Sequence, residues 1–192
     1  LNQAYVGLRY DARLTGLPAQ DLKFNQEVVK EEVGKLPGEL IIKYFPTKTA
    51  SITTINSHLE RCILQDKKPD LVIVDYADLL RGSFLGGELR HELGNIYEDL
   101  RGMAGESEIP VWTASQANRS ALEEDIIEAQ KISESYAKVM IADFVISLSR
   151  KIADKVANTG RWHIIKNRFG PDGLTFPSKM DTSTGVIHIF DE

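Results

Sequence analysis

Residues 71–80 read LVIVDYADLL, four consecutive apolar residues followed at once by the carboxylate of Asp75. An apolar run of this length is typical of a strand buried on both faces, which favours a parallel sheet. Residues 110–119, PVWTASQANR, repeat the pattern, with Gln116 after the apolar residues. Polar side chains that follow parallel strands meet at the sheet edge where open α/β folds bind ligands. We therefore expect an α/β fold in which Asp75 and Gln116 face one crevice.

Apolar residues at helical spacing predict helices before and between these strands. We expect two helices in residues 1–35, one after the N-cap Ser51, and one each at 88–106 and 133–141. Further strands are predicted at 39–45, 144–148, 161–166, 174–176 and 186–190. Because Gly, Pro and Asp separate the last three, the alternation should end in β-hairpins.

Length and composition restrict the possible classes of protein. The chain has 192 residues, enough for one α/β domain, and a formal net charge of −5, which excludes a uniformly basic nucleic-acid-binding protein. The charge is uneven, because residues 150–179 hold seven Lys or Arg and two Asp. With the single cysteine Cys62 and no apolar stretch long enough to span a membrane, we expect a cytoplasmic protein without membrane contact.

Asp75 and Gln116 are of the right chemical types for a nucleotide site. A carboxylate after a buried strand positions magnesium in nucleotide hydrolases, usually through a bound water. An amide can donate and accept at once, so Gln116 could sense a γ-phosphate or orient the attacking water. The alternatives are that Asp75 caps the following turn and that Gln116 belongs to an ordinary polar loop.

Residues 166–173, KNRFGPDG, place two cations beside a tight turn. At i and i+2 of an extended segment, Lys166 and Arg168 point to the same side and could clamp a phosphate. The alternative is a solvated hairpin edge. The sequence contains no G-x-x-x-x-G-K-[ST], the loop that usually cradles the phosphates of a nucleoside triphosphate.

Four motifs in this order resemble the C-terminal ATPase domain of DnaB-type hexameric replicative helicases. Residues 71–80 resemble that family's Walker B strand, and residues 110–119 its strand ending in Ser-Gln-x-Asn-Arg. Residues 134–143 resemble its Glu-Ser…Ala-Asp segment, and residues 166–173 its Lys-x-Arg-x-Gly-Pro-x-Gly turn. The resemblance implies a RecA-like, largely parallel β-sheet flanked by helices, with C-terminal β-hairpins.

The resemblance also implies roles in ATP hydrolysis. Asp75 would bind Mg²⁺ through water, and Gln116 would sense the γ-phosphate of ATP and couple it to DNA-binding loops. Lys166 and Arg168 would reach the nucleotide of a neighbouring subunit. A pair that acts in trans makes hydrolysis depend on assembly. The implied assembly is a homo-oligomer, hexameric when intact, with single-stranded DNA and possibly primase as partners.

For single-stranded DNA the candidate contacts are basic residues in two segments, Arg81, Arg90, Arg119 and Lys131. The expected DNA loop, residues 119–135, has five acidic residues against two basic ones. Binding to single strands normally uses positive charge along the backbone track. We therefore expect DNA contact through backbone amides of this loop or through the segment from Arg81 to Arg90.

In the family that the chain resembles, the Walker A motif and a catalytic Glu come before the position of Leu1. We therefore expect residues 1–192 to form a single RecA-like domain that lacks its N-terminal Walker A portion. The predicted function is part of a replicative helicase motor that couples ATP hydrolysis to translocation on single-stranded DNA. The alternatives are a RecA- or clock-type ATPase of recombination or regulation, and a non-catalytic RecA-like interaction module.

We expect the 192-residue chain alone to hydrolyse no ATP, because it carries no Walker A loop or lysine for the β- and γ-phosphates. Phosphate release by the purified chain, with Mg²⁺ and ATP, measures this. Turnover that depends on Mg²⁺ would refute the expectation.

Overall fold

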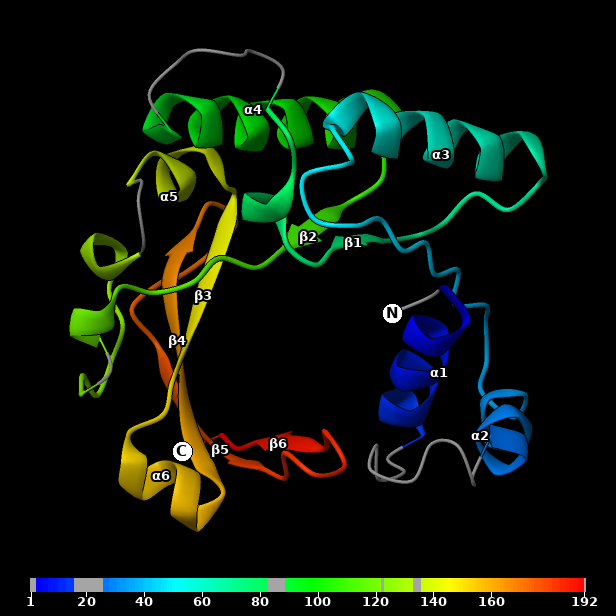
Figure 1. The fold of residues 1–192 in the computed structure, drawn as a ribbon. Helices are drawn as coiled ribbons and strands as arrows, with labels where there is room; N and C mark the ends of the chain where they lie inside the picture. The colour runs from blue at the N-terminus through cyan, green and yellow to red at the C-terminus, as the bar shows by residue number, and fades with distance from the viewer. Residues whose placement is uncertain (1–2, 16–25, 83–88, 122, 133–135, 192) are drawn as a thin grey trace. The chain divides into compact units, whose positions relative to one another are not determined.

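A computed structural model of the chain describes residues 3–15, 26–82, 89–121, 123–132 and 136–191. The elements up to the second strand are α1 (Gln3–Leu14), α2 (Gln26–Val33), α3 (Ile52–Leu64), β1 (Val72–Val74), the 3-10 turn η2 (Ala77–Leu79), α4 (Leu89–Ser107) and β2 (Val111–Thr113) (Figure 1). The remainder holds η3 (Arg119–Ala121), η4 (Ala129–Lys131), α5 (Ala137–Ile141), β3 (Phe144–Ser149), α6 (Ile152–Ala157), β4 (Thr159–Asn167), β5 (Thr175–Met180) and β6 (Ile187–Ile189). The chain divides into two compact units. Unit 1 is Leu1–Tyr44, Arg150–Trp162 and Phe176–Glu192, and unit 2 is Phe45–Ser149 and His163–Thr175.

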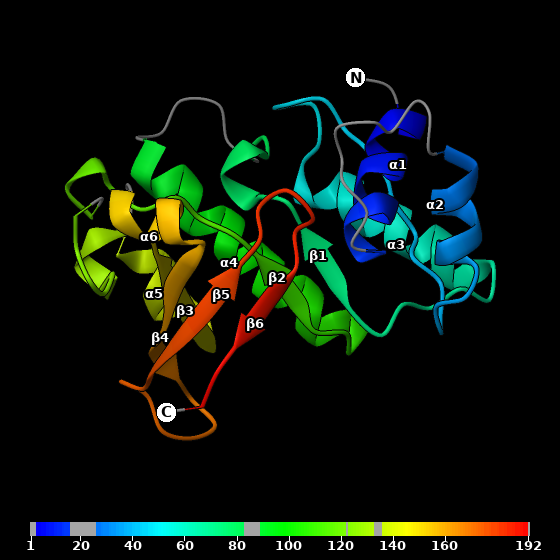
Figure 2. The ribbon, with the colours of Figure 1, turned by 90° about the horizontal axis from the view of Figure 1, so that it is seen from below.

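In unit 2, β1 and β2 pair in parallel, as predicted, with Val74 beside Thr113. Helix α4 lies along one face of this pair in both ribbon views (Figures 1 and 2). On the strands themselves, Ile73 is 67% exposed and Trp112 is 50% exposed. The expectation of burial on both faces is therefore wrong for the described part of the chain, where α4 and η2 pack on one face of the pair.

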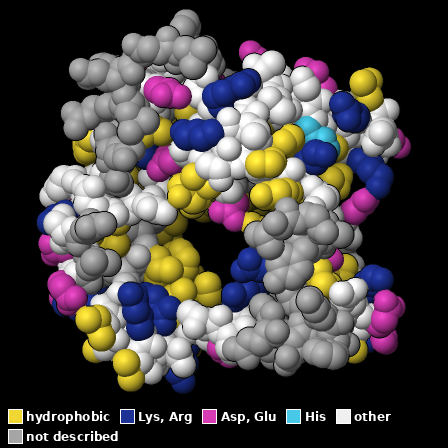
Figure 3. All heavy atoms as spheres, in the orientation of Figure 1, with side chains coloured by type: hydrophobic (Ala, Val, Ile, Leu, Met, Phe, Trp, Pro, Cys, Tyr) yellow, Lys and Arg dark blue, Asp and Glu magenta, His cyan; other side chains and the backbone are white. Residues whose placement is uncertain are grey.

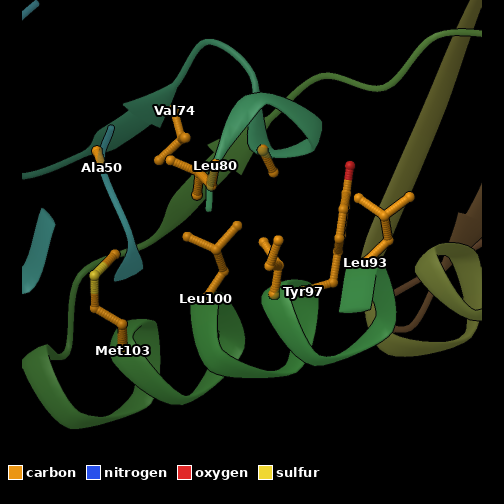
Figure 4. Close-up of a cluster of buried hydrophobic side chains, with 9 residues drawn as sticks. Ala50, Val74, Leu80, Leu93, Tyr97, Leu100 and Met103 are labelled. Carbon is orange, nitrogen blue, oxygen red and sulfur yellow. The ribbon is translucent and has the colours of Figure 1, made fainter. Parts of the chain in front are cut away.

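The core of unit 2 lies between α4, the β1–β2 pair and η2. Helix α4 supplies a stripe of buried side chains at helical spacing, Leu93, Ile96, Tyr97, Leu100 and Met103, and Val74, Ala77 and Leu80 face it (Figure 4). This inward face of α4 was predicted from the same periodicity. Because the stripe runs along most of the helix, α4 fixes the turn that follows β1 as well as the strand.

The second sheet has the strand order β3-β4-β5-β6. Its last two strands pair antiparallel, with Ser178 beside Ile189 and Met180 beside Ile187, and they lie side by side in Figure 2. The C-terminal hairpin was thus predicted correctly. Among the described residues, parallel pairing is confined to β1 and β2, and the four-stranded sheet is antiparallel, so a largely parallel sheet is not found there.

In unit 1, helices α1 and α2 pack through Ala12, Val29 and the partly buried Leu8. The strand predicted at 39–45 is wrong, because this segment runs without strand pairing. The backbone of this segment is bound by the side chain of Gln3 and not by a neighbouring strand. The Gln3 amide donates to the carbonyl of Ile42 at 2.6 Å and accepts from the backbone N–H of Tyr44 at 2.5 Å.

Local capping explains where two of the helices begin. Ser51 caps α3, as predicted, and forms a capping box with Thr54. Helix α6 was not predicted, and it begins where Asp154 accepts from the backbone N–H of Lys151 at 2.8 Å. Asp154 also pairs with Arg161 at 2.6 Å. Among the described helices, none is both long and apolar enough to cross a membrane.

Truncating the stripe of α4 should destabilise unit 2. Leu93→Ala removes a side chain that is 1% exposed, and we expect it to lower the free energy of unfolding by about 2–5 kcal/mol. Chemical denaturation measures the loss. The matched control is Leu64→Ala, at a position that is 87% exposed, with an expected change of about 0.5 kcal/mol or less. Equal losses in the two variants would contradict the assignment of the core.

Candidate functional site

The candidate site begins at the edge where β1 and β2 end. Because the strands are parallel, the segments after Val74 and Thr113 leave the sheet at the same edge. Asp75 is exposed there. The side-chain amide of Gln116 donates to the hydroxyl of Tyr76 at 3.0 Å. The two positions predicted from the sequence are thus linked through the residue that follows Asp75.

The hydroxyl of Thr113 fixes the turn that carries Asp75. It donates to the carbonyl of Val74 at 2.8 Å and accepts from the backbone N–H of Ala77 at 2.9 Å. The Thr113 side chain therefore binds the backbone on both sides of the dipeptide Asp75–Tyr76. The backbone of this turn is fixed by a cross-strand contact that the sequence analysis did not predict.

Behind this turn lies a buried ion pair. The ammonium of Lys138, in α5, donates to both carboxylate oxygens of Asp78, each at 2.9 Å. Lys138 is 3% exposed and lies 5.4 Å from the centre of the Tyr97 ring. Asp78 also accepts from the hydroxyls of Tyr97 at 3.0 Å and Ser115 at 3.2 Å. Four elements or their flanking segments therefore meet at one carboxylate.

The charges of this cluster compensate one another. Burial, and then the nearby charge of Asp78, raise the pKa of the Tyr97 phenol above its ordinary value. The phenol therefore stays protonated and donates to Asp78. The buried ammonium of Lys138 is thus paired with a partly buried carboxylate that has two hydroxyl donors, as the rule that buried charges are paired and hydrogen-bonded requires. Sequence reasoning missed this cluster, although a single Lys within the apolar helix of residues 137–141 was a signal.

Lys166 and Arg168 point to the same side, as their spacing predicted, and converge on the C-terminal end of α5. Lys166 donates to the carbonyls of Val139 and Met140, both at 2.8 Å, and Arg168 donates to the Met140 carbonyl at 3.1 Å. Cations favour the carbonyl end of a helix. Burial, and then the charge of Arg168, lower the pKa of Lys166.

Asp143 and the tight turn hold this pair from the other side. Arg168 lies 3.4 Å from the Asp143 carboxylate, which also pairs with Arg101 of α4 at 2.9 Å. The turn after Arg168 contains Gly173 at a φ of +78°, where an L side chain would be strained. Its N–H donates to the Ile164 carbonyl at 2.8 Å. The turn predicted at residues 166–173 therefore presents Arg168 close to α5.

Of the four candidate DNA contacts, Arg81 and Lys131 have side chains within the described part of the chain. Arg81 is exposed, and its backbone N–H donates to the Ala50 carbonyl at 2.8 Å. Lys131 pairs with Glu124 at 2.9 Å. Arg90 lies in α4 and Arg119 in η3, and the side chains of both lie outside the described part of the chain. On the face drawn in Figure 3, the described Lys and Arg side chains lie in small groups with Asp and Glu beside them.

The segment after Gln116 is fastened at several points. An isolated bridge joins Ala117 to Ile132 and closes the neck of the loop. Within the loop, the Ile127 carbonyl accepts from Ser147 at 2.8 Å, and the Asp125 carbonyl accepts from Ser149 at 2.5 Å. Both serines belong to β3. In its described residues, the expected DNA loop of residues 119–135 thus contains the 3-10 turns η3 and η4 and is held against a strand.

A model of a known protein family matches most of the chain. The family model described as "DnaB-like helicase C terminal domain" matches residues 16–180. The chain belongs to this DnaB-like family. Two curated relatives are the "DnaB-like replicative helicase" of Enterobacteria phage T4, 27% identical over 178 residues, and a protein of Trieres chinensis named "Probable replicative DNA helicase", 30% identical over 148 residues. The matches cover 84% and 71% of this chain but only 37% and 32% of those relatives.

Solved structures show that the DnaB-like chain has the mixed α/β fold of RecA-like ATPases. One of them, described as an ATPase domain, has a TM-score of 0.79 at 20% identity, and the match covers 100% of this chain and 72% of that one. A DnaB-like replicative helicase, described with its interactions with primase, has a TM-score of 0.77 at 20% identity, covering 97% and 48%. The RadB recombinase has a lower TM-score of 0.53 at 16% identity, covering 92% and 72%.

Removing the clamp at Thr113 should loosen the Asp75 turn. Thr113→Val keeps the shape but leaves the Val74 carbonyl and the Ala77 N–H without this partner, so we expect about 1 kcal/mol less stability. Hydrogen exchange should speed up at the Ala77 amide. Thr53→Val, at an exposed position of α3, is the matched control and should change stability by about 0.5 kcal/mol or less. An unchanged Ala77 amide would refute the clamp.

Proposed function

We propose that this chain forms part of a replicative helicase motor that couples ATP hydrolysis to movement along single-stranded DNA. The observation that carries the proposal is the meeting of Asp75, Tyr76 and Gln116 at the edge where two parallel strands end. That edge is where α/β folds bind ligands. Membership of the DnaB-like family supports the same reading. We also propose that the chain forms one RecA-like domain and that the sheet of this domain is largely parallel.

Asp75 is the residue we propose for Mg²⁺. Its carboxylate is exposed at the strand edge, and the hydroxyl of Tyr76 and the amide oxygen of Gln116 belong to the same region. Oxygen donors of this kind fit Mg²⁺, which keeps several waters and takes few protein ligands. When bound with ATP, Mg²⁺ neutralises charge on the phosphates. Within the described ranges, no group of three or more His, Cys, Asp and Glu could hold a metal ion.

Gln116 is proposed to bind the γ-phosphate or the attacking water. Its amide already donates to the phenol of Tyr76, so its side chain is held at the edge of the sheet, where it is exposed. Reaching a phosphate would exchange this neutral acceptor for a charged one, which makes a stronger hydrogen bond. Gln116 would then report the presence of ATP to the loop that begins at Ala117.

Lys166 and Arg168 are proposed to act on the nucleotide of a neighbouring subunit. They now contact carbonyls and a carboxylate, Met140 and Asp143 among them, so the site they occupy already selects for positive charge. Phosphate oxygens could replace these acceptors, with Arg168 supplying a planar fork. The active site would then lie between subunits of a ring, which we propose to be a hexamer. Single-stranded DNA, contacted through Arg81, Arg90, Arg119 or Lys131, and primase are the proposed partners.

Replacing Arg168 tests the role in trans. In the full-length natural protein, Arg168→Ala should lower ATP turnover on the order of 10³-fold or more, while the affinity for ATP changes little. Turnover with and without single-stranded DNA, together with nucleotide binding, measures both. The matched control is Arg61→Ala, at an exposed position of α3 outside the site, with turnover near wild type. Unchanged turnover in Arg168→Ala would remove its role.

Mixing two inactive variants locates the site. Asp75→Asn and Arg168→Ala subunits should each be inactive alone, but mixed oligomers contain interfaces that join a wild-type Asp75 to a wild-type Arg168. Recovered turnover in the mixture supports a shared site. No recovery despite proven subunit exchange would contradict it.

Measurements of ATP turnover and of DNA unwinding by the full-length protein separate the alternatives. A non-catalytic interaction module predicts that the full-length protein hydrolyses no ATP. A recombination-type ATPase predicts turnover without unwinding of a forked DNA. The fold of the chain is more similar to that of the DnaB-like replicative helicase than to that of the recombinase, because the TM-score is higher for the helicase. This difference favours the helicase proposal over the recombination-type alternative.

A further inference from the structure

The buried Lys138–Asp78 pair is unexplained by stability alone. Replacing a buried ion pair by apolar residues of similar volume is often neutral or stabilising. Lys138 is 3% exposed in a helix whose other described residues are apolar, so an apolar side chain would suit the position. What a pair with several hydrogen bonds adds is a defined geometry among the groups that it joins.

At one end, the pair holds the residue before Gln116. The Ser115 oxygen accepts from Lys138 at 3.1 Å, while its hydroxyl donates to Asp78 at 3.2 Å. A serine hydroxyl has a single hydrogen, so both functions of Ser115 are engaged by the pair. A movement of the Gln116 backbone toward a ligand therefore displaces Ser115 or changes the backbone torsions between the two residues.

At the other end, the pair holds α5. Lys138 directly precedes Val139 and Met140, whose carbonyls accept from Lys166 at 2.8 Å each. Arg168 also donates to the Met140 carbonyl. In an α-helix consecutive residues are only about 1.5 Å apart along the axis, so a shift of Lys138 moves these carbonyls with it.

We infer that Lys138 is a positioning residue that couples the Gln116 loop to the Lys166–Arg168 pair through α5. The inference rests on the proposed function, in which Gln116 senses the subunit's own ATP and the cationic pair serves the neighbour's. Every contact in the connection is a hydrogen bond within unit 2. One subunit's nucleotide would thereby set the position of the cations that it offers to the next subunit.

The decisive comparison is Ser115→Val against Ser115→Thr in the full-length protein. The two side chains have nearly the same shape, and only threonine keeps the hydroxyl that Lys138 and Asp78 contact. Hydrogen exchange of the amides in residues 137–142 is measured with and without Mg²⁺ and a non-hydrolysable ATP analogue. We expect the analogue to change this exchange in wild type and in Ser115→Thr. In Ser115→Val the response should shrink about fivefold or more, while the affinity for the analogue changes by less than about threefold.

A second variant removes the charges without leaving one unpaired. Asp78→Asn with Lys138→Met should keep the melting temperature near wild type and should also lose the α5 response. ATP turnover provides a further readout, with a lower kcat at unchanged KM in both Ser115→Val and the double variant, and rescue in Ser115→Thr.

The outcomes separate the inference from the proposed function. An α5 response that persists in Ser115→Val and in the double variant overturns the inference, since the response then arises from the neighbour's nucleotide acting on Lys166 and Arg168. Binding of the analogue by wild type with no change at α5 overturns it as well. Failure of wild type to bind the analogue instead overturns the proposed function, and the inference falls with it.

Discussion

The hydroxyl of Thr113 is the contact on which the geometry of the candidate site depends. It binds Val74 at the end of one strand and Ala77 at the start of the next turn, so the segment between them is held at two points. The contact therefore fixes the backbone just beyond the ends of the paired strands β1 and β2. Helix α4 packs under the β1–β2 pair and η2, and its Tyr97 hydroxyl donates to Asp78 of η2 (Figure 4). The polar side chains of this turn are therefore carried by a backbone that is fixed to the core.

The elements that could be predicted were those whose signal is local. Helix α4 shows its buried face as a repeat along its own sequence, and Ser51 marks its helix by side-chain chemistry alone. The segment 39–45 has the composition of a strand, but its backbone partner is Gln3, about forty positions earlier in the chain, which no local pattern reveals. Helix α6 has six residues, too few to show a period.

The residues of the candidate site also divide into those with a local sequence signal and those without one. Asp75, Gln116 and the 166–173 turn were detectable because polar groups after apolar strands, and glycines at a turn, stand out in the sequence. The Asp78–Lys138 pair joins residues sixty positions apart, and the lone Lys of an apolar helix shows that a partner is needed without showing which residue it is. The sequence also showed that residues 150–179 are rich in Lys and Arg. Within it, Arg161 is paired with Asp154 and Arg168 with Asp143, so part of that charge is neutralised locally.

The loop between Ala117 and Ile132 is closed at its neck and fastened along its length to two serines of β3. A displacement of the loop at Asp125 or Ile127 would therefore pull on β3. The acidic residues around Arg119 and Lys131 weaken the attraction of this segment for a polyanion, so a ligand bound there would gain less from charge than from specific contacts.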